Sequence, residues 1–252
     1  MSKLIAVTGK GGVGKTTVSA LLIKNLLDAG KTPVLAIDAD PNSCLDAALG
    51  VKAENTVGRA REEVRDAASS GAAAGISKNE ILQMKIEQGL VESNGFDLIA
   101  MGRPEGAGCY CYANNVLKDI IAKISSRYPY VVLDNEAGLE NLSRRIVQKV
   151  DLLVLVSDPS NAGLNTLVRL YNLANEMGMN FDKLALVINR LRTDTLPARM
   201  NEIREITKAD IVTGLPEDPE IAEFAEENNN YLNLSAQNPL LISISEEILC
   251  RI

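Results

Sequence analysis

Short aliphatic runs recur along the chain, and longer segments with apolar residues at helical spacing lie between them. Runs such as VVL and LLVLV contain no polar residue, which is typical of strands in a parallel sheet that is buried on both faces. The alternation predicts an α/β fold, with a doubly wound, mostly parallel sheet flanked by helices. The expected strands are 4–8, 34–37, 97–101, 130–133, 152–156, 184–188 and 211–212, and the expected helices are 16–29, 115–126, 140–149, 162–177 and 196–206.

One stretch, 53–95, breaks this alternation. It is charged at first, then rich in Ala, Gly and Ser (ASSGAAAGIS), and it contains no clear strand. We interpret it as a helical insertion with a mobile middle, and a plain surface excursion is an equally open alternative. The 252 residues are enough for one α/β domain with a large core. We therefore expect a single domain over 1–252 that carries the insertion at about 53–95.

Composition narrows the range of partners and chemistries. The formal net charge of −7 and the pI of about 4.9 disfavour binding to nucleic acid or to an anionic membrane, which depends on Lys and Arg. The chain has no histidine, so an imidazole base or metal ligand is excluded. No apolar run approaches the ~18 residues of a membrane span, and the N-terminus does not resemble a signal peptide. We expect a cytoplasmic protein.

A glycine-rich loop follows the first expected strand and opens the first expected helix. Its sequence, GKGGVGKTT at 9–17, fits the phosphate-binding pattern in the context that makes the pattern credible. Backbone N–H groups and the helix N-terminus would bind the phosphates of ATP, Lys15 would lie along the β- and γ-phosphates, and Thr16 would ligate Mg²⁺. The expected contacts with the nucleotide are Gly9, Lys10, Gly11, Gly12, Val13, Gly14, Lys15, Thr16 and Thr17.

The second lysine of this loop, Lys10, is an additional signal. The loop resembles the deviant Walker A loop of the superfamily of MinD, ParA and the nitrogenase iron protein, which carries such a lysine. The resemblance implies that Lys10 reaches the nucleotide of a partner subunit in a homodimer and stabilises the transition state there. Arginine residues that act in this way accelerate hydrolysis by ~10³–10⁵. A solvated loop lysine is the alternative.

Acidic residues end two expected strands. In IDADP at 37–41, the resemblance places Asp40 beside the attacking water and Asp38 near the Mg²⁺ shell. A cap on the following helix is the alternative for Asp38. In VVLDNEAG at 131–138, Asp134 resembles the Walker B aspartate that holds Mg²⁺ through water, and Gly138 resembles the switch glycine that senses the γ-phosphate. A carboxylate can orient water and accept its proton, so ATP hydrolysis needs no histidine. No role follows for Glu136.

Two later segments resemble the base-binding parts of the superfamily. Asn189, after the strand LALVI, resembles an asparagine that reads adenine, and Arg190 stands next to it. The segment GLPEDP at 214–219 resembles the loop that packs on the adenine around Pro216 and Glu217. The resemblance to the superfamily thus extends from residue 3 to about residue 220.

Four cysteines suggest metal chemistry. Cys109 and Cys111 form a C-x-C pair in GAGCYCYANN, well placed to chelate but strained as a mutual disulfide. A closed thiolate site needs four ligands, and a two-fold dimer would supply the other two. We interpret Cys44 as a packed small side chain and Cys250 as incidental. Two cysteines with no metal are the alternative.

At this point the sequence resembles the CooC-type and AcsF-type nickel-insertion ATPases, through GKGGVGKTT, DADPNSCL and GCYCYANN. The resemblance implies an ATP-dependent metallochaperone that binds Ni²⁺, or Zn²⁺, at Cys109 and Cys111. Its client would be carbon monoxide dehydrogenase or acetyl-CoA synthase. An iron–sulfur ATPase that donates electrons is the main alternative, although switch II (DNEAGLENLSRR) contains no cysteine. A MinD- or ParA-like positioning ATPase is the other.

Overall fold

A single eight-stranded sheet forms the centre of the molecule. The computed structural model describes residues 2–69, 78–103, 123–138, 149–193 and 195–252. Neighbouring strands follow the order β3-β4-β2-β5-β1-β6-β7-β8, and every pairing is parallel except that of β3 with β4. The predicted fold class is therefore confirmed. The strands are β1 (Lys3–Gly9), β2 (Val34–Asp38), β3 (Val91–Glu92), β4 (Phe96–Ala100), β5 (Tyr130–Asp134), β6 (Lys149–Ser157), β7 (Asn180–Leu191) and β8 (Ile211–Pro216).

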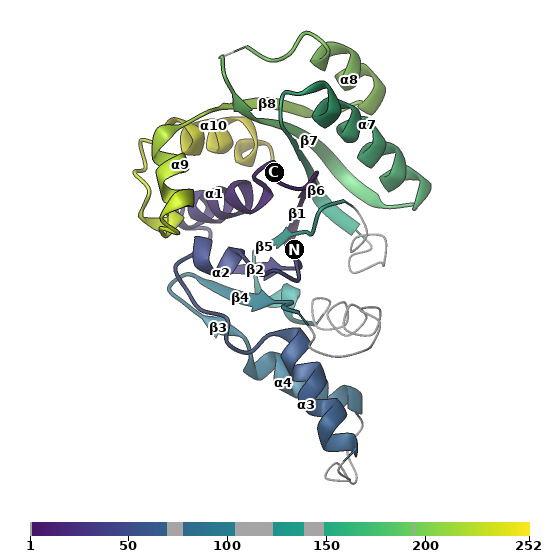
Figure 1. Cartoon of the computed structure of the whole chain (residues 1–252), viewed down its shortest axis with the longest axis vertical. Coiled ribbons are helices and arrows are strands. Elements are labelled where there is room, and N and C mark those ends of the chain that lie inside the picture. The colour runs from purple at the N-terminus through teal and green to yellow at the C-terminus, as the bar shows by residue number, and fades with distance from the viewer. Residues whose placement is uncertain (1, 70–77, 104–122, 139–148, 194) are drawn as a thin grey trace.

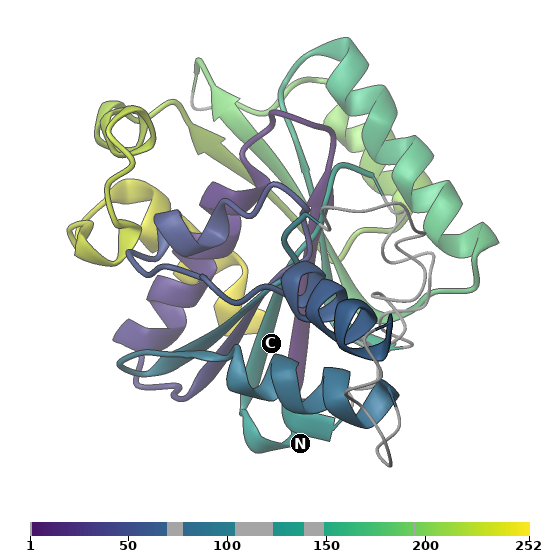
Figure 2. The ribbon, with the colours of Figure 1, turned by 60° about the horizontal axis from the view of Figure 1, so that its bottom comes forward.

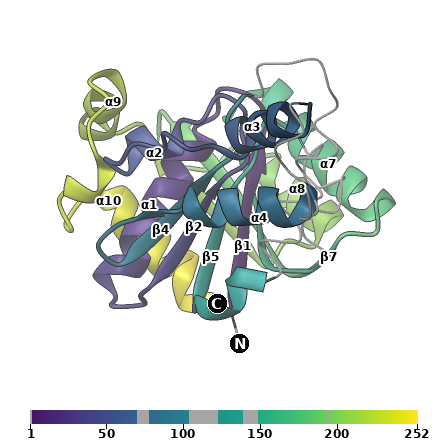
Figure 3. The same cartoon turned by 90° about the horizontal axis from the view of Figure 1, so that it is seen from below.

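Helices cover both faces of this sheet (Figure 3), and the strands alternate their side chains between the two layers. In β6, for example, Val154 joins one core cluster while Leu153 and Leu155 join the other. This double burial explains the uninterrupted aliphatic runs within strands such as β6. The α-helices are α1 (Lys15–Asp28), α2 (Leu45–Ala48), α3 (Val57–Ser69), α4 (Lys78–Gln88), α7 (Asn161–Glu176), α8 (Met200–Thr207), α9 (Pro219–Glu226) and α10 (Pro239–Glu247).

Each face of the sheet is covered by its own set of helices. Buried residues of α1, α2 and α10 share one core cluster, and those of α3, α4, α7 and α8 share the other. Three short 3₁₀ helices complete the described structure: η1 (Ser125–Arg127), η2 (Tyr231–Asn233) and η3 (Leu249–Arg251). None of the helices in the described part of the chain is long and apolar enough to cross a membrane.

The departures from the sequence prediction lie at short or polar elements. The segment 53–95 contains α3 and α4 but also β3, so the expectation of no strand there is wrong. Its expected mobile middle falls on 70–77, outside the described residues. Of the expected helix 115–126, only 123–126 is described: residues 123 and 124 are helical, and Ser125 begins η1. The expected helix 140–149 lies outside the described residues except for Lys149, which begins β6. The helices α2, α9 and α10 were not predicted.

The topology collects the loops that carry chemistry at one edge of the sheet. Because β1, β2, β5, β6, β7 and β8 run parallel, their carboxyl ends meet there (Figure 2). Gly9 ends β1, and Asp38 and Asp134 end β2 and β5 as register partners. Ligands of doubly wound sheets bind at such an edge, where the direction of winding reverses.

Candidate functional site

The phosphate loop connects β1 to α1 in a conformation that its glycines permit. Gly14 has φ of 90° and stands at the N-cap of α1, and a Cβ there would overlap the side-chain amide of Asn189. A Cβ on Gly9 would overlap the Val156 carbonyl of β6. Gly11 and Gly12 are exposed. The backbone of this loop is therefore tightly enclosed at its two ends and open at its middle.

The two lysines of the loop lie in different surroundings. Lys15 is only 8% exposed, and its Nζ donates to the Lys10 carbonyl at 3.5 Å. Lys10 is exposed and borders a cleft of about 720 Å³ between the phosphate loop and α7. Lys15 therefore belongs to the interior of its own loop, whereas the side chain of Lys10 is free to meet another molecule. The other residues that line the cleft are Gly9, Gly11, Ala137, Gly138, Thr166, Arg169, Leu170, Asn172, Leu173 and Glu176.

A buried carboxylate lies below the loop. The Asp134 carboxylate accepts hydrogen bonds from the hydroxyls of Thr16, at 2.7 Å, and Ser19, at 3.0 Å. Burial raises the pKa of Asp134 to about 6, against the opposing effect of these two hydrogen bonds. The sequence analysis missed Ser19, although its position one turn after Thr16 on α1 places both hydroxyls on one helix face.

A second buried carboxylate ends the neighbouring strand. Asp38 accepts hydrogen bonds from the backbone N–H of Asp40, at 3.1 Å, and of Leu45, at 2.9 Å. Leu45 is the first residue of α2, so Asp38 does bond to the start of the following helix. Burial, with the nearby charge of Asp134, raises the pKa of Asp38 to about 7. Two buried acids therefore lie side by side beneath the loop, and burial disfavours the charged form of each.

Asp40 lies in the turn between β2 and α2, which we term switch I (residues 39–44). Its carboxylate oxygen accepts hydrogen bonds from the backbone N–H of Asn42, at 2.8 Å, and from its side-chain amide, at 2.9 Å. Unlike Asp38, Asp40 is partly exposed. It is thus the acid of this pair that a water molecule can reach.

The segment after β5 is bonded to the phosphate loop. The Gly138 N–H donates to the Gly9 carbonyl at 3.0 Å, and the Thr8 hydroxyl donates to the Gly138 carbonyl. Gly138 has φ of 91°, a region that favours glycine. Asn135 is buried and its amide donates to the Val7 carbonyl at 3.0 Å, which ties the segment to β1. Glu136 is half-buried.

A cavity of about 1030 Å³ opens at the ends of β7 and β8. Asn189 is 7% exposed, and its side-chain amide donates to the Val13 carbonyl at 2.8 Å, which joins the cavity to the phosphate loop. Arg190 is exposed, with φ of 58°, and its N–H donates to the Asn189 side-chain oxygen. Thr17, Pro216 and Glu217 line the same cavity, so the structure brings these five predicted residues together. The remaining lining residues are Leu191, Arg192, Thr193, Asp218, Pro219, Ile221, Ala222, Ala225, Glu226 and Leu240.

The structure describes two of the four cysteines, Cys44 and Cys250. Cys109 and Cys111 lie outside the described residues. Cys44 is exposed, so its interpretation as a packed small side chain is wrong. It stands on the polar turn before α2, where partial desolvation and neighbouring carboxylates raise the pKa of its thiol and disfavour a thiolate. Cys250 is also free and exposed. Within the described ranges, no group of three or more Cys, Asp or Glu side chains is arranged to hold a metal ion.

Comparison with known proteins gives the family. The model of the CobQ/CobB/MinD/ParA nucleotide-binding domain matches residues 4–231. An uncharacterized ATP-binding protein of Methanocaldococcus jannaschii is 41% identical over 244 residues, which cover 96% of each chain. The carbon monoxide dehydrogenase accessory protein CooC of Rhodospirillum rubrum is 37% identical over 191 residues, which cover 69% of this chain and 70% of CooC.

A solved structure agrees with the fold. The septum site-determining protein MinD of Pyrococcus horikoshii, determined as a complex with Mg-ADP, superimposes with a TM-score of 0.65 over 96% of this chain and 93% of that one. The sequences are 20% identical, so this likeness concerns the fold alone. Together with the phosphate loop at the edge of a parallel sheet, the family match identifies this chain as a P-loop ATPase of the CobQ/CobB/MinD/ParA nucleotide-binding family.

Proposed function

We propose that this ATPase is a metallochaperone that works as a homodimer. It binds Ni²⁺ between two chains at Cys109 and Cys111 and delivers the ion to carbon monoxide dehydrogenase or acetyl-CoA synthase. The observation that carries the proposal is the C-x-C pair in a chain that is 37% identical to a carbon monoxide dehydrogenase accessory protein. Two soft thiolates per chain suit Ni²⁺ and Zn²⁺, and two chains complete a four-thiolate site.

The described residues fit a Mg²⁺ ion with ATP. Thr16 and Asp134 offer a hydroxyl and a carboxylate 2.7 Å apart, and Asp38 adds a second buried carboxylate beside them. Mg²⁺ prefers such oxygen ligands, keeps several waters and completes its shell with phosphate oxygens. Burial raises the pKa of both acids, and a bound divalent cation would favour their charged forms.

Hydrolysis divides between the two subunits. Lys15, held inside its own loop, binds the β- and γ-phosphates, and Asp40 orients the attacking water. Exposed Lys10 crosses to the nucleotide of the partner subunit. Contact of the Gly138 N–H with the γ-phosphate would replace its hydrogen bond to Gly9. Closure of the dimer would thereby depend on the presence of the γ-phosphate.

The cavity at the ends of β7 and β8 takes the adenosine. Asn189 reads the base, Arg190 borders it, and the backbone around Pro216 and Glu217 packs on its face. The geometry favours this assignment because Asn189 bonds to the Val13 carbonyl, so that the base-reading residue and the phosphate loop are in direct contact. The cavity is also large enough for a nucleoside.

A link between the nucleotide and the C-x-C pair runs through switch I. The Arg103 guanidinium donates to the side-chain oxygen of Asn42, whose amide in turn donates to Asp40. The Gly102 N–H donates to the Ser43 hydroxyl at 3.1 Å. Residues 102 and 103 are thus bonded to the turn that carries Asp40, and Cys109 follows six residues later. A rearrangement of Asp40 on hydrolysis would therefore move the backbone that leads to the thiols.

The rest of the chain agrees with a cytoplasmic single-domain carrier. We propose that 1–252 forms one P-loop ATPase domain, with α3 and α4 as an insertion into it. The cysteines that the structure describes, Cys44 and Cys250, are free thiols, as a reducing compartment requires. An amphipathic tail that binds membranes would expose its apolar face, whereas Leu241, Ile244 and Ile248 of the C-terminal segment are buried. This packing disfavours a positioning ATPase that uses the tail as an anchor.

Metal titration tests the proposal. Ni²⁺ added to the metal-free protein should saturate at half an equivalent per chain and shift monomer to dimer in sedimentation. Cys109→Ser/Cys111→Ser should lose both effects and keep its affinity for ATP. The matched control is Cys44→Ser/Cys250→Ser, which removes the two exposed thiols and should behave as the natural protein.

Three results would contradict the bridging site: saturation at one ion per chain without a change in mass, undiminished binding in the first variant, or loss of binding in the control. Anaerobic analysis of the purified protein separates the electron-donating alternative. Iron and sulfide with a brown colour would indicate a cluster, whereas nickel or zinc without sulfide would support the carrier.

A further inference from the structure

The base cavity has one wall whose position is not secured by packing. Helix α9 contributes Ile221, Ala222, Ala225 and Glu226 to the cavity, yet none of its residues is buried. Its apolar contacts are partial, with Ile221 and Phe224 resting at the edge of the core. Because so little of α9 is buried, its position depends on polar contacts with the neighbouring segments.

Those contacts converge on Asn238. Its side-chain amide donates to the Asp218 carboxylate at 3.3 Å and to the Glu220 carboxylate at 3.0 Å. Its side-chain oxygen accepts from the Leu240 N–H at 2.9 Å and caps α10. Asn238 is 3% exposed, and both its donors and its acceptor are used. Asp218 shares its carboxylate between Asn238 and the N–H of Ile221, where it caps α9.

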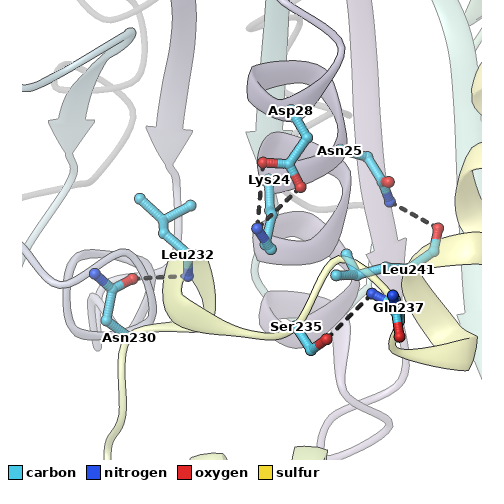
Figure 4. Close-up of polar contacts among 8 residues, drawn as sticks. All are labelled: Lys24, Asn25, Asp28, Asn230, Leu232, Ser235, Gln237 and Leu241. Carbon is cyan, nitrogen blue, oxygen red and sulfur yellow. Dashed lines mark hydrogen bonds and ion pairs between the residues drawn. The ribbon is translucent and has the colours of Figure 1, made fainter.

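Asn238 stands on a firm base, because α10 packs on α1. Leu240, Leu241 and Ile244 are buried in the core cluster that contains the apolar face of α1. Figure 4 shows the polar contacts of this region, including the Asn25 side-chain amide of α1 donating to the Leu241 carbonyl at 3.0 Å. Since α1 begins in the phosphate loop, the C-terminal segment connects the phosphate end of the site to the wall of the base cavity.

We propose that Asn238 is a positioning residue for the base end of the nucleotide site, and that the C-terminal segment 232–252 completes this site. The inference rests on the assignment of the cavity to adenosine made above. Residues 232–252 lie beyond the 4–231 that the family model matches, but Leu240 lines the cavity and Asn238 holds its wall. Asn238 touches neither base nor phosphate, and it acts through Asp218 and Glu220.

The test compares ATP with inorganic tripolyphosphate, which contacts the phosphate loop alone, as ligands of the full-length protein with Mg²⁺. Asn238→Ala should weaken ATP binding about tenfold and change tripolyphosphate binding less than about twofold, because it removes contacts to charged groups on the base wall only. Asn238→Asp should lose more ATP affinity, since it places a third carboxylate against Asp218 and Glu220.

Asn230→Ala is the matched control. Asn230 lies just before this segment and its side-chain oxygen accepts from the Leu232 N–H at 2.9 Å (Figure 4), as that of Asn238 does from the Leu240 N–H. It does not line the cavity, so its loss should lower stability without changing the ratio of the two affinities. Glu220→Ala, which leaves the cap of α10 intact, should weaken ATP binding about threefold and gives a readout if Asn238→Ala folds poorly.

Unchanged ATP affinity in Asn238→Ala and Glu220→Ala would overturn the proposal, as would equal losses for ATP and tripolyphosphate or an equal loss in Asn230→Ala. If the natural protein binds tripolyphosphate as tightly as ATP, the assignment of the cavity to the base is wrong. The experiment involves no nickel, so its outcome is independent of the metallochaperone proposal.

Discussion

The two ends of the nucleotide site are built in opposite ways. The phosphate end comes from one continuous loop at 9–17, with Asp38 and Asp134 buried beneath it at the ends of adjacent strands. The base end is assembled from the ends of β7 and β8, from α9, and from α10 near the C-terminus. Glycine geometry and hydrogen bonds within the loop shape the first. Contacts between segments far apart in sequence shape the second.

Because of this difference, substitutions at the two ends should affect different kinetic parameters of ATP hydrolysis. Groups that develop contacts with the transferring phosphate act on the transition state, whereas contacts with the base are made equally before and during the reaction. Changes at the phosphate end should therefore lower kcat, and changes at the base end should raise KM.

The largest expected effect is on catalysis at the phosphate end. Lys10→Ala should lower kcat about 10³-fold or more and leave the Kd for ATP within about threefold, because we propose that Lys10 meets only the nucleotide of the partner. Steady-state hydrolysis and ATP binding, measured on the same preparation, check this. Lys15→Ala should instead lose binding as well. Hydrolysis by Lys10→Ala at the natural rate would remove the basis for the two-subunit site.

Mixing the two variants sharpens this prediction. A dimer of one Lys10→Ala chain and one Lys15→Ala chain has one nucleotide that is bound by an intact Lys15 and faced by an intact Lys10. Hydrolysis should therefore reappear in the mixture although neither variant hydrolyses ATP alone. A mixture as inactive as its components would show that Lys10 acts within its own chain.

A smaller effect is expected where switch I meets residues 102 and 103. Asn42→Ala and Arg103→Ala should leave the affinity for Ni²⁺ without nucleotide unchanged, but should abolish the difference in that affinity between nucleotide states. Couplings of this kind typically amount to roughly 5–150-fold. The two variants remove the same side-chain contact, so the double variant should behave as either single one.

Arg204→Ala provides the control for this prediction. Arg204 is an exposed arginine on α8, which packs on α7, and its removal should leave the coupling intact. If Asn42→Ala and Arg103→Ala keep the full difference in Ni²⁺ affinity between nucleotide states, the contact between Asn42 and Arg103 does not couple the two sites.

A further prediction concerns the pH dependence of stability in the protein without nucleotide or Mg²⁺. The fold raises the pKa of Asp38 from 3.8 to about 7, so the folded state favours the protonated acid. The resulting stabilisation is complete below pH 3.8 and is lost as the pH rises to about 7. Asp38→Asn should flatten this decline by up to about 1.4 kcal/mol per pH unit, measured by urea denaturation between pH 4 and pH 7. Parallel curves would contradict the pKa shift.

The phosphate end could be predicted from the sequence because its chemistry is local. GKGGVGKTT fixes both a backbone conformation and the residues within it, and uninterrupted aliphatic runs place the acids of IDADP and VVLDNEAG at strand ends. The parallel sheet then brings those ends together without further information. Where the prediction failed nearby, at Cys44, an apparently apolar side chain stands on an exposed turn.

The base end could be predicted only in part. Asn189, Pro216 and Glu217 follow strands and were found, but Asn238 and Leu240 belong to a segment whose place depends on how α10 packs on α1. Nothing local in NPLLISISEE distinguishes a helix that closes a nucleotide cavity from one on a free surface. The helices α2 and α9 have only 4 and 8 residues, so they are too short for helical periodicity to reveal them.

The affinity for Ni²⁺ in two nucleotide states tests the central claim most directly. Asp40→Asn keeps the shape of the side chain but removes the charge that we propose orients water, so it should hold ATP in a closed dimer. We expect the Kd for Ni²⁺ of this variant to differ at least about tenfold between Mg·ATP and no nucleotide, with Ni²⁺ changing ATP affinity by the same factor. Equal Ni²⁺ affinities in the two states would contradict nucleotide control of the metal site.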